Sequence, residues 1–419
     1  MNNNQKTIHY GWIVLAMGTL AVFGALGLAR FGYSTILPAI QSNLNLNNEQ
    51  AGRLATFNLA GYLLMSGIGG ALASRYGARL VVTLGLALAG LGMLFSGWAQ
   101  SFTTLLVWRC VTGIGSGAAN IAVMGLWAAW FTAKRRGLAS GIAVSGSSLA
   151  LIGTGLAVPQ LLTLYGAGAW RTCWFIFGAI TLVLAISSFL LIRNHPKDSG
   201  LNPVGTEAQA SQPAPVSQSA GKKPSLRQVY RSWPVWRLGL VYIAFGFSYI
   251  IYMTFFIKHL VADSGYSQTA AGGLFMTMGW FSLLCGFLWG SVSDRIGRRQ
   301  TLLIIYLIHT VAFAAFGGSN PTLLTISAIL FGLTAWSIPA IMAAICGDLM
   351  GPGLAPAALG FITLFFGIGQ ALGPVIAGAI ADKAGSFTPA LFLAAGIALL
   401  GAIGTLFLKK DANKANATG

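Results

Sequence analysis

The feature of this sequence that most constrains its fold is a series of long apolar runs that are nearly free of charge. A helix needs about 20 such residues to cross the ~30 Å hydrocarbon core of a bilayer. Membrane-spanning strands would instead alternate apolar and polar residues over about 10 positions, and these runs do not alternate. Twelve runs can be placed, at residues 12–40, 50–73, 79–98, 103–130, 137–164, 169–192, 235–262, 267–291, 300–318, 321–349, 355–381 and 387–408. The sequence therefore predicts an all-α membrane protein with twelve transmembrane helices.

The distribution of charge indicates how the chain is oriented in the membrane. The formal net charge of +17 would suggest a nucleic-acid partner if the protein were soluble. With the N-terminus inside, however, 19 of the 25 Lys and Arg residues fall in inner loops and tails. Because cytoplasmic loops carry an excess of Lys and Arg, this pattern predicts that both termini are cytoplasmic. We expect a multi-pass protein of a bacterial inner membrane, in contact with the lipid bilayer and not with nucleic acid.

A polar segment divides the apolar runs into six and six. It is rich in Pro, Ser, Gln and Ala, and we expect a disordered cytoplasmic linker that ends in a short helix at Leu226 to Trp233. The predicted organisation is a first six-helix bundle at 1–192, the linker at 193–233, a second six-helix bundle at 234–408 and a cytoplasmic tail at 409–419. "GALASRYGAR" at 70–79 repeats as "GSVSDRIGRR" at 290–299, 220 residues later. A parallel repeat predicts two bundles around a central axis, with substrate between them.

These residues carry a resemblance to a known family. The loop "GSVSDRIGRR" resembles the loop signature of the major facilitator superfamily, and "RCVTGIGSGAAN" at 109–120 is similar to its fourth-helix motif. The stretches "WAAWFTAKRRGLASGIAVSG" and "AWRTCWFIFG" are similar to those of bacterial monocarboxylate and oxalate carriers of that superfamily. Unlike those carriers, the chain has no basic residue in the middle of the runs at 267–291 or 355–381. The resemblance implies the major facilitator fold and a transport function.

The loop motif suggests a gate on the cytoplasmic side. Asp294 can pair with helix N-terminal amides or with Arg135 and Arg136 of the loop before 137–164, so that the two halves are held together. Three basic residues of the two loop copies belong to the same predicted gate, namely Arg75, Arg295 and Arg298. The alternative is that these arginines only fix the topology of the loops.

Two arginines lie inside apolar runs and away from the ends of these runs, where a charge is costly and indicates function. Both Arg30 and Arg109 fall in the outer half of their predicted helices and could share a cavity. Helical periodicity adds polar and aromatic residues on the faces expected to line this site. The predicted substrate-binding residues are Arg30, Arg109, Ser116, Asn120, Tyr242, Tyr249, Trp336 and Gln370. The alternatives are that Arg30 extends outward to the membrane surface, that Arg109 braces backbone carbonyls, and that the aromatic residues only pack helices.

The acidic residues indicate the charge of the substrate. All eight lie in loops or at helix ends, so no deep carboxylate can neutralise Arg30 and Arg109. An anionic substrate would supply the missing charge, and a guanidinium is suited to bidentate pairing with a carboxylate. We therefore expect a monomeric secondary transporter for a small organic anion, most simply a monocarboxylate, that works by alternating access and proton symport. No enzyme motif, cofactor or metal site is expected. The alternatives are a multidrug or other solute efflux antiporter and a transport-inactive sensor with the same fold.

Overall fold

The computed structural model describes residues 9–206 and 226–408, and the described chain is helical throughout, apart from turns and one isolated bridge. The expected tail at 409–419 and the centre of the linker lie outside the described residues. The α-helices of the first half, in chain order and with a π-helical segment η1 in the first span, are α1 (Tyr10–Val22), η1 (Phe23–Phe31), α2 (Gly32–Leu44), α3 (Asn48–Tyr76), α4 (Ala78–Trp98), α5 (Phe102–Trp130), α6 (Ala133–Tyr165) and α7 (Trp170–Leu191). Those after them are α8 (Leu226–Arg231), α9 (Trp233–Ala262), α10 (Gln268–Ser282), α11 (Cys285–Ile296), α12 (Arg298–Phe316), α13 (Pro321–Thr334), α14 (Ser337–Ala384) and α15 (Thr388–Leu406).

These helices account for the twelve expected spans. Ten helical segments among the described residues are long and apolar enough to cross a membrane, and α3 makes an eleventh if its two parts, bent by 48°, form one span. The run at 267–291 is divided between α10 and α11. The long α14 contains a break at Gly351 (φ 70°, ψ 170°), which separates the tenth span from the eleventh. The expected fold class is confirmed.

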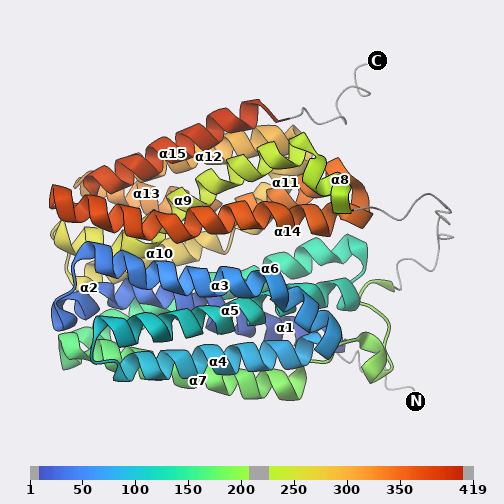
Figure 1. The fold of residues 1–419 in the computed structure, drawn as a ribbon, viewed down its shortest axis with the longest axis horizontal. Coiled ribbons are helices and arrows are strands. Elements are labelled where there is room, and N and C mark those ends of the chain that lie inside the picture. The colour runs from blue at the N-terminus through green and yellow to red at the C-terminus, as the bar shows by residue number, and fades with distance from the viewer. Residues whose placement is uncertain (1–8, 207–225, 409–419) are drawn as a thin grey trace, which may run out of the picture.

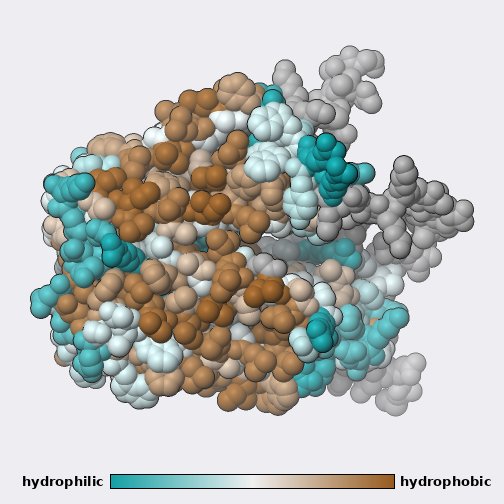
Figure 2. Space-filling model, in the orientation of Figure 1, coloured by the Kyte–Doolittle hydropathy of each residue, from teal (hydrophilic) through white to brown (hydrophobic). Residues whose placement is uncertain are grey.

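The surface has the apolar belt of a membrane protein. In Figure 2 hydrophobic residues cover the middle of the visible face, and hydrophilic residues gather at the two ends. Large aliphatic side chains on the outer helices are strongly exposed, such as Leu164 at 73%, Ile186 at 63% and Leu400 at 61%. Water would penalise this exposure, whereas the acyl chains of a bilayer do not.

The helices form two halves that lie side by side. In Figure 1, α1 to α7 make the lower half and α9 to α15 make the upper half, while the start of α1, the short helix α8 and the end of α15 lie toward the right. We call this end of the molecule the terminal face and the opposite end the far face. The repeated loop motifs turn alike in the two halves, because Gly77 (φ 87°) and Gly297 (φ 99°) both adopt a conformation that favours glycine.

The linker is only partly as expected. The short helix α8 (Leu226–Arg231) confirms the helix expected at its end. The expectation of disorder is wrong for residues 193–206, because this segment packs against the first half. The Val204 amide donates to the Trp130 carbonyl at 2.9 Å, and the Thr132 amide donates to the Val204 carbonyl at 3.2 Å. Backbone hydrogen bonds hold this segment in place. Because such bonds do not depend on the side chains, the polar composition of the segment did not indicate that it is ordered.

Candidate substrate site between the halves

The centre of the candidate site is Arg30, at the end of the π-helical segment of the first span. Its side chain points inward, since the residue is only 9% exposed. One guanidinium nitrogen, Nη2, donates a hydrogen bond to the hydroxyl of Tyr249 on α9. The guanidinium carbon also lies 5.7 Å from the ring centre of Tyr62 and 5.4 Å from that of Phe31. The alternative that Arg30 extends outward to the membrane surface is therefore wrong.

The second half supplies an aromatic wall beside Arg30. Tyr249 accepts a second hydrogen bond from Nε2 of Gln370 on α14, so its oxygen lies between the two halves. Its ring stacks on Phe245 at 4.6 Å, and Phe366 stacks on Tyr242 at 4.6 Å. The expected aromatic face of α9 thus packs against α14 and also borders the site. Gln370 and Tyr249 lie together at Arg30, as the sequence predicts.

Arg109 behaves differently from Arg30. It is 1% exposed, and its Nη1 donates to the Ala29 carbonyl at 2.7 Å. Its guanidinium lies 4.8 Å from the ring centre of Tyr33 and 5.0 Å from that of Trp174. Arg109 therefore braces the backbone of the widened first span, which is the alternative role considered for it.

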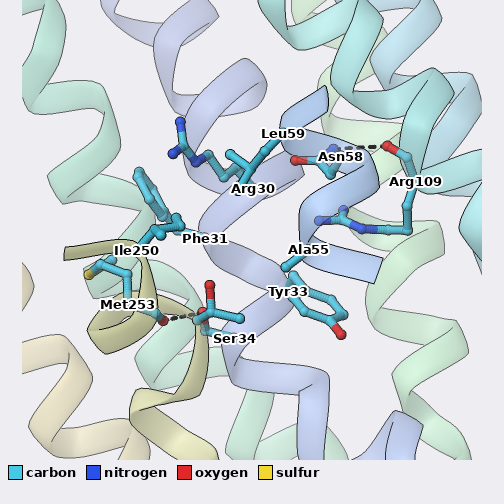
Figure 3. A pocket seen from close by; sticks show the side chains of 11 residues that line it. Arg30, Phe31, Tyr33, Ser34, Ala55, Asn58, Leu59, Arg109, Ile250 and Met253 are labelled. Atoms are coloured by element: carbon cyan, nitrogen blue, oxygen red, sulfur yellow. Dashed lines mark hydrogen bonds between the residues drawn. The ribbon is translucent and has the colours of Figure 1, made fainter. Parts of the chain in front are cut away.

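Both arginines nevertheless border one small pocket between the halves. Ser34, Asn58 and Met253 also line it, and its free volume of about 10 Å³ is room for roughly one water molecule. In Figure 3 the Arg30 guanidinium points away from Arg109. The two guanidinium groups therefore do not point toward a common position where one ligand could contact both. The pocket must also widen before it can hold an organic anion.

The other predicted residues divide into near and remote ones. Asn120 reaches the site through Tyr62, since its Nδ2 donates to the Tyr62 hydroxyl at 2.8 Å. Trp336 donates from Nε1 to the Ser148 hydroxyl at 3.1 Å, and its ring lies 5.4 Å from Phe31. Ser116 instead bonds the Gly113 carbonyl of its own helix, so it does not reach Arg30.

Two residues of α3 were missed by the sequence reasoning. Tyr62 lies under Arg30, and Asn58 donates from Nδ2 to the Arg109 carbonyl at 3.0 Å. The signal was present, because these polar residues are four positions apart in an otherwise apolar run and must share one helix face.

The charge of Arg30 is not neutralised by any acidic residue of the described chain. The ion pairs among the described residues are those of Arg53 with Glu49, of His259 with Asp263, and of Arg298 with Asp294 and Asp348. Arg30 instead has a neutral hydroxyl as its partner, and its Nε is buried with no partner among the described residues. A buried guanidinium with an unused donor can pair with an anion, and Nε of Arg109 is without a partner in the same way among the described residues.

The expected cytoplasmic gate is not joined in this state. Asp294 pairs with Arg298 of its own half at 2.7 Å, and among the described residues it does not pair with Arg135 or Arg136. Arg136 donates to the Phe131 and Ala128 carbonyls of the first half. Three other basic residues named for this gate are Arg75, which lies over the Tyr76 ring at 5.3 Å, and the exposed Arg135 and Arg295. A role for these residues in holding the halves together stays a prediction for another state.

The halves are instead joined at the far face. The carboxylate of Asp382, near the end of α14, accepts hydrogen bonds from the amides of Asn48 and Glu49 at 2.8 Å each. These amides begin α3, where backbone donors have no partner within the helix. We call this contact the outer latch.

Glycines let the backbones of the two halves approach beside the outer latch. A Cβ atom at Gly378 would lie 2.2 Å from the Asn48 carbonyl oxygen, and one at Gly52 would lie 2.2 Å from that of Pro374. Close contacts along α3 and α14 continue inward as far as Leu63 and Gly367. Figure 2 shows the surface hollowed between the halves toward the terminal face. The far face is closed in this structure.

Comparisons with known proteins agree with this architecture. The sequence model of the family described as "Uncharacterised MFS-type transporter YbfB" matches residues 22–406. The chain is 25% identical over 97% of its length to the probable sulfoacetate transporter SauU of Cupriavidus necator, of which it covers 95%. It is 24% identical to the hexuronate transporter of Bacillus subtilis, with 90% of each chain covered. It is 26% identical to human monocarboxylate transporter 11, with 94% of this chain and 81% of that one covered.

A solved structure shares the fold. The crystal structure of a bacterial homologue of the human lysosomal transporter Spinster, in an inward-facing and unoccupied conformation, superposes with a TM-score of 0.69. The match covers 96% of this chain and 95% of the other at 19% sequence identity. At that identity the likeness concerns the arrangement of helices.

Proposed function

Because the chain belongs to the MFS-type transporter family and is therefore a membrane transporter and not an enzyme, we propose that it carries a small organic anion by alternating access. One observation carries the proposal: a buried arginine that has no acidic partner among the described residues lies where the two halves meet. Removing an ionised group from water is costly unless it is paired. A substrate anion provides that pairing while it is bound.

The substrates for which the relatives are named support an anionic substrate. Sulfoacetate, hexuronates, monocarboxylates and tartrate are all anions at neutral pH. The three relatives above are named for the first three, and a putative tartrate transporter of Agrobacterium vitis is 23% identical to this chain. A monocarboxylate is the simplest substrate for one free guanidinium, because one carboxylate can accept both of its parallel donors. Tyr62, Tyr249 and Gln370 then surround the rest of the molecule.

We propose that the structure represents the inward-facing state, which is open toward the cytoplasm. The terminal face is proposed to be cytoplasmic, in a bacterial inner membrane, because the loops on this side carry most of the Lys and Arg residues. With the far face closed by the outer latch, a substrate would exchange with the cytoplasm. The protein is proposed to work as a monomer whose halves alternate around Arg30.

Transport is expected to be electrically silent and driven by a proton gradient. Since no carboxylate of the described residues lines the site, a carried proton would travel with the anion, and an arginine that stays charged adds no net movement of charge. Uptake into proteoliposomes should therefore respond to an imposed pH gradient and not to membrane potential. The two gradients are set separately with buffers and with potassium and valinomycin. Uptake driven by potential alone, or only by anion preloaded inside, would contradict proton symport.

His309 on α12 is expected to be dispensable for this coupling. It is fully buried, and neither ring nitrogen has a hydrogen-bond partner among the described residues. The rings of Phe245, Phe313 and Phe331 lie 5.3–5.8 Å from it, so aromatic side chains separate it from Arg30. His309→Gln should keep pH-driven uptake to within about twofold, once the amount of folded protein is matched by size-exclusion chromatography. Loss of the pH dependence with retained exchange would identify His309 as the proton carrier.

A further inference from the structure

A second pocket lies in the second half, at its terminal face. The beginnings of α9 and α12, the part of α14 just before its break at Gly351, and the end of α15 enclose it, and its free volume is about 100 Å³. Ile345, Leu349 and Phe407 contribute apolar walls, and two arginines, Arg237 and Arg299, contribute charge. The pocket therefore combines a cationic part with an apolar part.

The two arginines retain unused hydrogen-bond donors. Arg299 donates from Nε to the Thr405 carbonyl at 3.1 Å and from Nη2 to the Leu406 carbonyl at 2.6 Å, while Arg237 Nη1 lies 3.3 Å from the Phe407 carbonyl. A guanidinium has five N–H donors, so both keep some for a ligand. Among the described residues, no carboxylate lies within 4.0 Å of either arginine.

Aromatic residues place the pocket at the depth of lipid headgroups. Trp233 is 57% exposed and its ring lies 5.5 Å from the Arg237 guanidinium, while Phe407 is 67% exposed. Exposed tryptophans gather where acyl chains meet headgroups. The pocket thus offers positive charge and apolar side chains at the depth where the phosphate and the acyl chains of a phospholipid meet.

We propose that this pocket binds one anionic phospholipid, with its phosphate on Arg237 and Arg299 and an acyl chain along the apolar walls. Basic pockets between membrane helices suit such headgroups. A free phosphate would match the charge but would leave Ile345, Leu349 and Phe407 without a contact. The proposal is independent of the substrate, because the pocket is separate from Arg30.

The internal repeat provides a matched control. Arg79 stands 220 residues before Arg299 and caps its own half in the same way, with Nε donating to the Phe189 carbonyl at 2.7 Å. Its guanidinium lies 4.4 Å from the Phe189 ring, and its amide bonds Asn194. Arg79→Gln therefore removes an equivalent charge and an equivalent hydrogen bond to a helix-end carbonyl, at a position outside the pocket.

The test is native mass spectrometry of the full chain in a neutral detergent, titrated with phosphatidylglycerol and, in parallel, with phosphatidylcholine. We expect one tightly held phosphatidylglycerol. Arg237→Gln should weaken it about fivefold, and the double variant with Arg299→Gln roughly thirtyfold, whereas Arg79→Gln should leave it unchanged. Leu349→Trp should also release the lipid, because it fills the pocket while leaving both arginines and the cap of α15 in place.

Four results would overturn the proposal. Equal retention of phosphatidylcholine would show that charge does not select the ligand. Equal loss in Arg79→Gln, or binding unchanged in Leu349→Trp, would show attraction to the basic surface and not to the pocket. Displacement of the lipid by millimolar inorganic phosphate would show a site for a free anion.

Discussion

Arg30→Gln is expected to lower anion uptake by about 10- to 100-fold while leaving membrane insertion intact. Hydrogen bonds to a charged group contribute about 1.5–3 kcal/mol, and each 1.4 kcal/mol is a factor of about ten in affinity. The glutamine side chain is shorter and its contact with Tyr249 is weakened, but the hydrogen bonds of Ser34 to Met253 and of Thr56 to Ala371 still join the halves. Substrate affinity and uptake in proteoliposomes, at matched amounts of folded protein, measure the effect.

Two further variants distinguish the guanidinium from charge in general. Arg30→Lys should restore transport only in part, since an ammonium group is a point charge and not a planar fork. Arg53→Gln removes an exposed arginine of the same half, paired with Glu49 at the surface, and should transport normally. Full activity of Arg30→Gln would remove Arg30 from the binding site.

Gly378→Ala is expected to hold the far face open and to lower transport by about tenfold or more. The added Cβ atom would lie 2.2 Å from the Asn48 carbonyl oxygen of the other half, so the halves could not close there. A closure penalty of about 3 kcal/mol would change the population ratio roughly a hundredfold. Distances between spin labels at Asn45 and Ser386, with the native cysteines replaced, measure the opening of the far face.

The control for this change is Gly360→Ala on the same helix. No heavy atom lies within 4 Å of a Cβ atom there, so the substitution should change neither the distance between the two labels nor the transport rate. Each half can fold in the Gly378 variant, because the clash is between halves and not within one. Normal transport with a closed far face would show that the close approach of Gly378 and Asn48 is not needed in the cycle.

The helices and the position of Arg30 could be predicted from the sequence because both depend on local patterns. Apolar runs fix the spans, and a period of 3.6 residues places Tyr242 and Tyr249 on one face. Gln370 could be placed on the wall because it is a polar residue inside an apolar run. Tyr62 and Asn58 show the same pattern and were within reach of the same reasoning.

The outer latch could not be predicted in this way. Asp382 ends its helix and resembles any loop-end acid, while its partners, Asn48 and Glu49, lie more than 330 residues away and act through backbone amides. For Arg109 the sequence left two roles open, because the partner that decides between them, the Ala29 carbonyl of the π-helical first span, cannot be identified from sequence position. Which face is closed depends on packing between halves, where two arrangements of one sequence differ little in free energy.

The most direct test of the central claim is uptake by the purified protein in proteoliposomes of labelled small anions compared with a labelled organic cation. Lactate, sulfoacetate, a hexuronate and tartrate form the anion panel, and Arg30→Gln vesicles provide the baseline. We expect at least one anion to accumulate above that baseline under an inward proton gradient, and no accumulation of the cation. Accumulation of the cation, or anion uptake equal in the wild type and Arg30→Gln, would contradict transport of an anion held by Arg30.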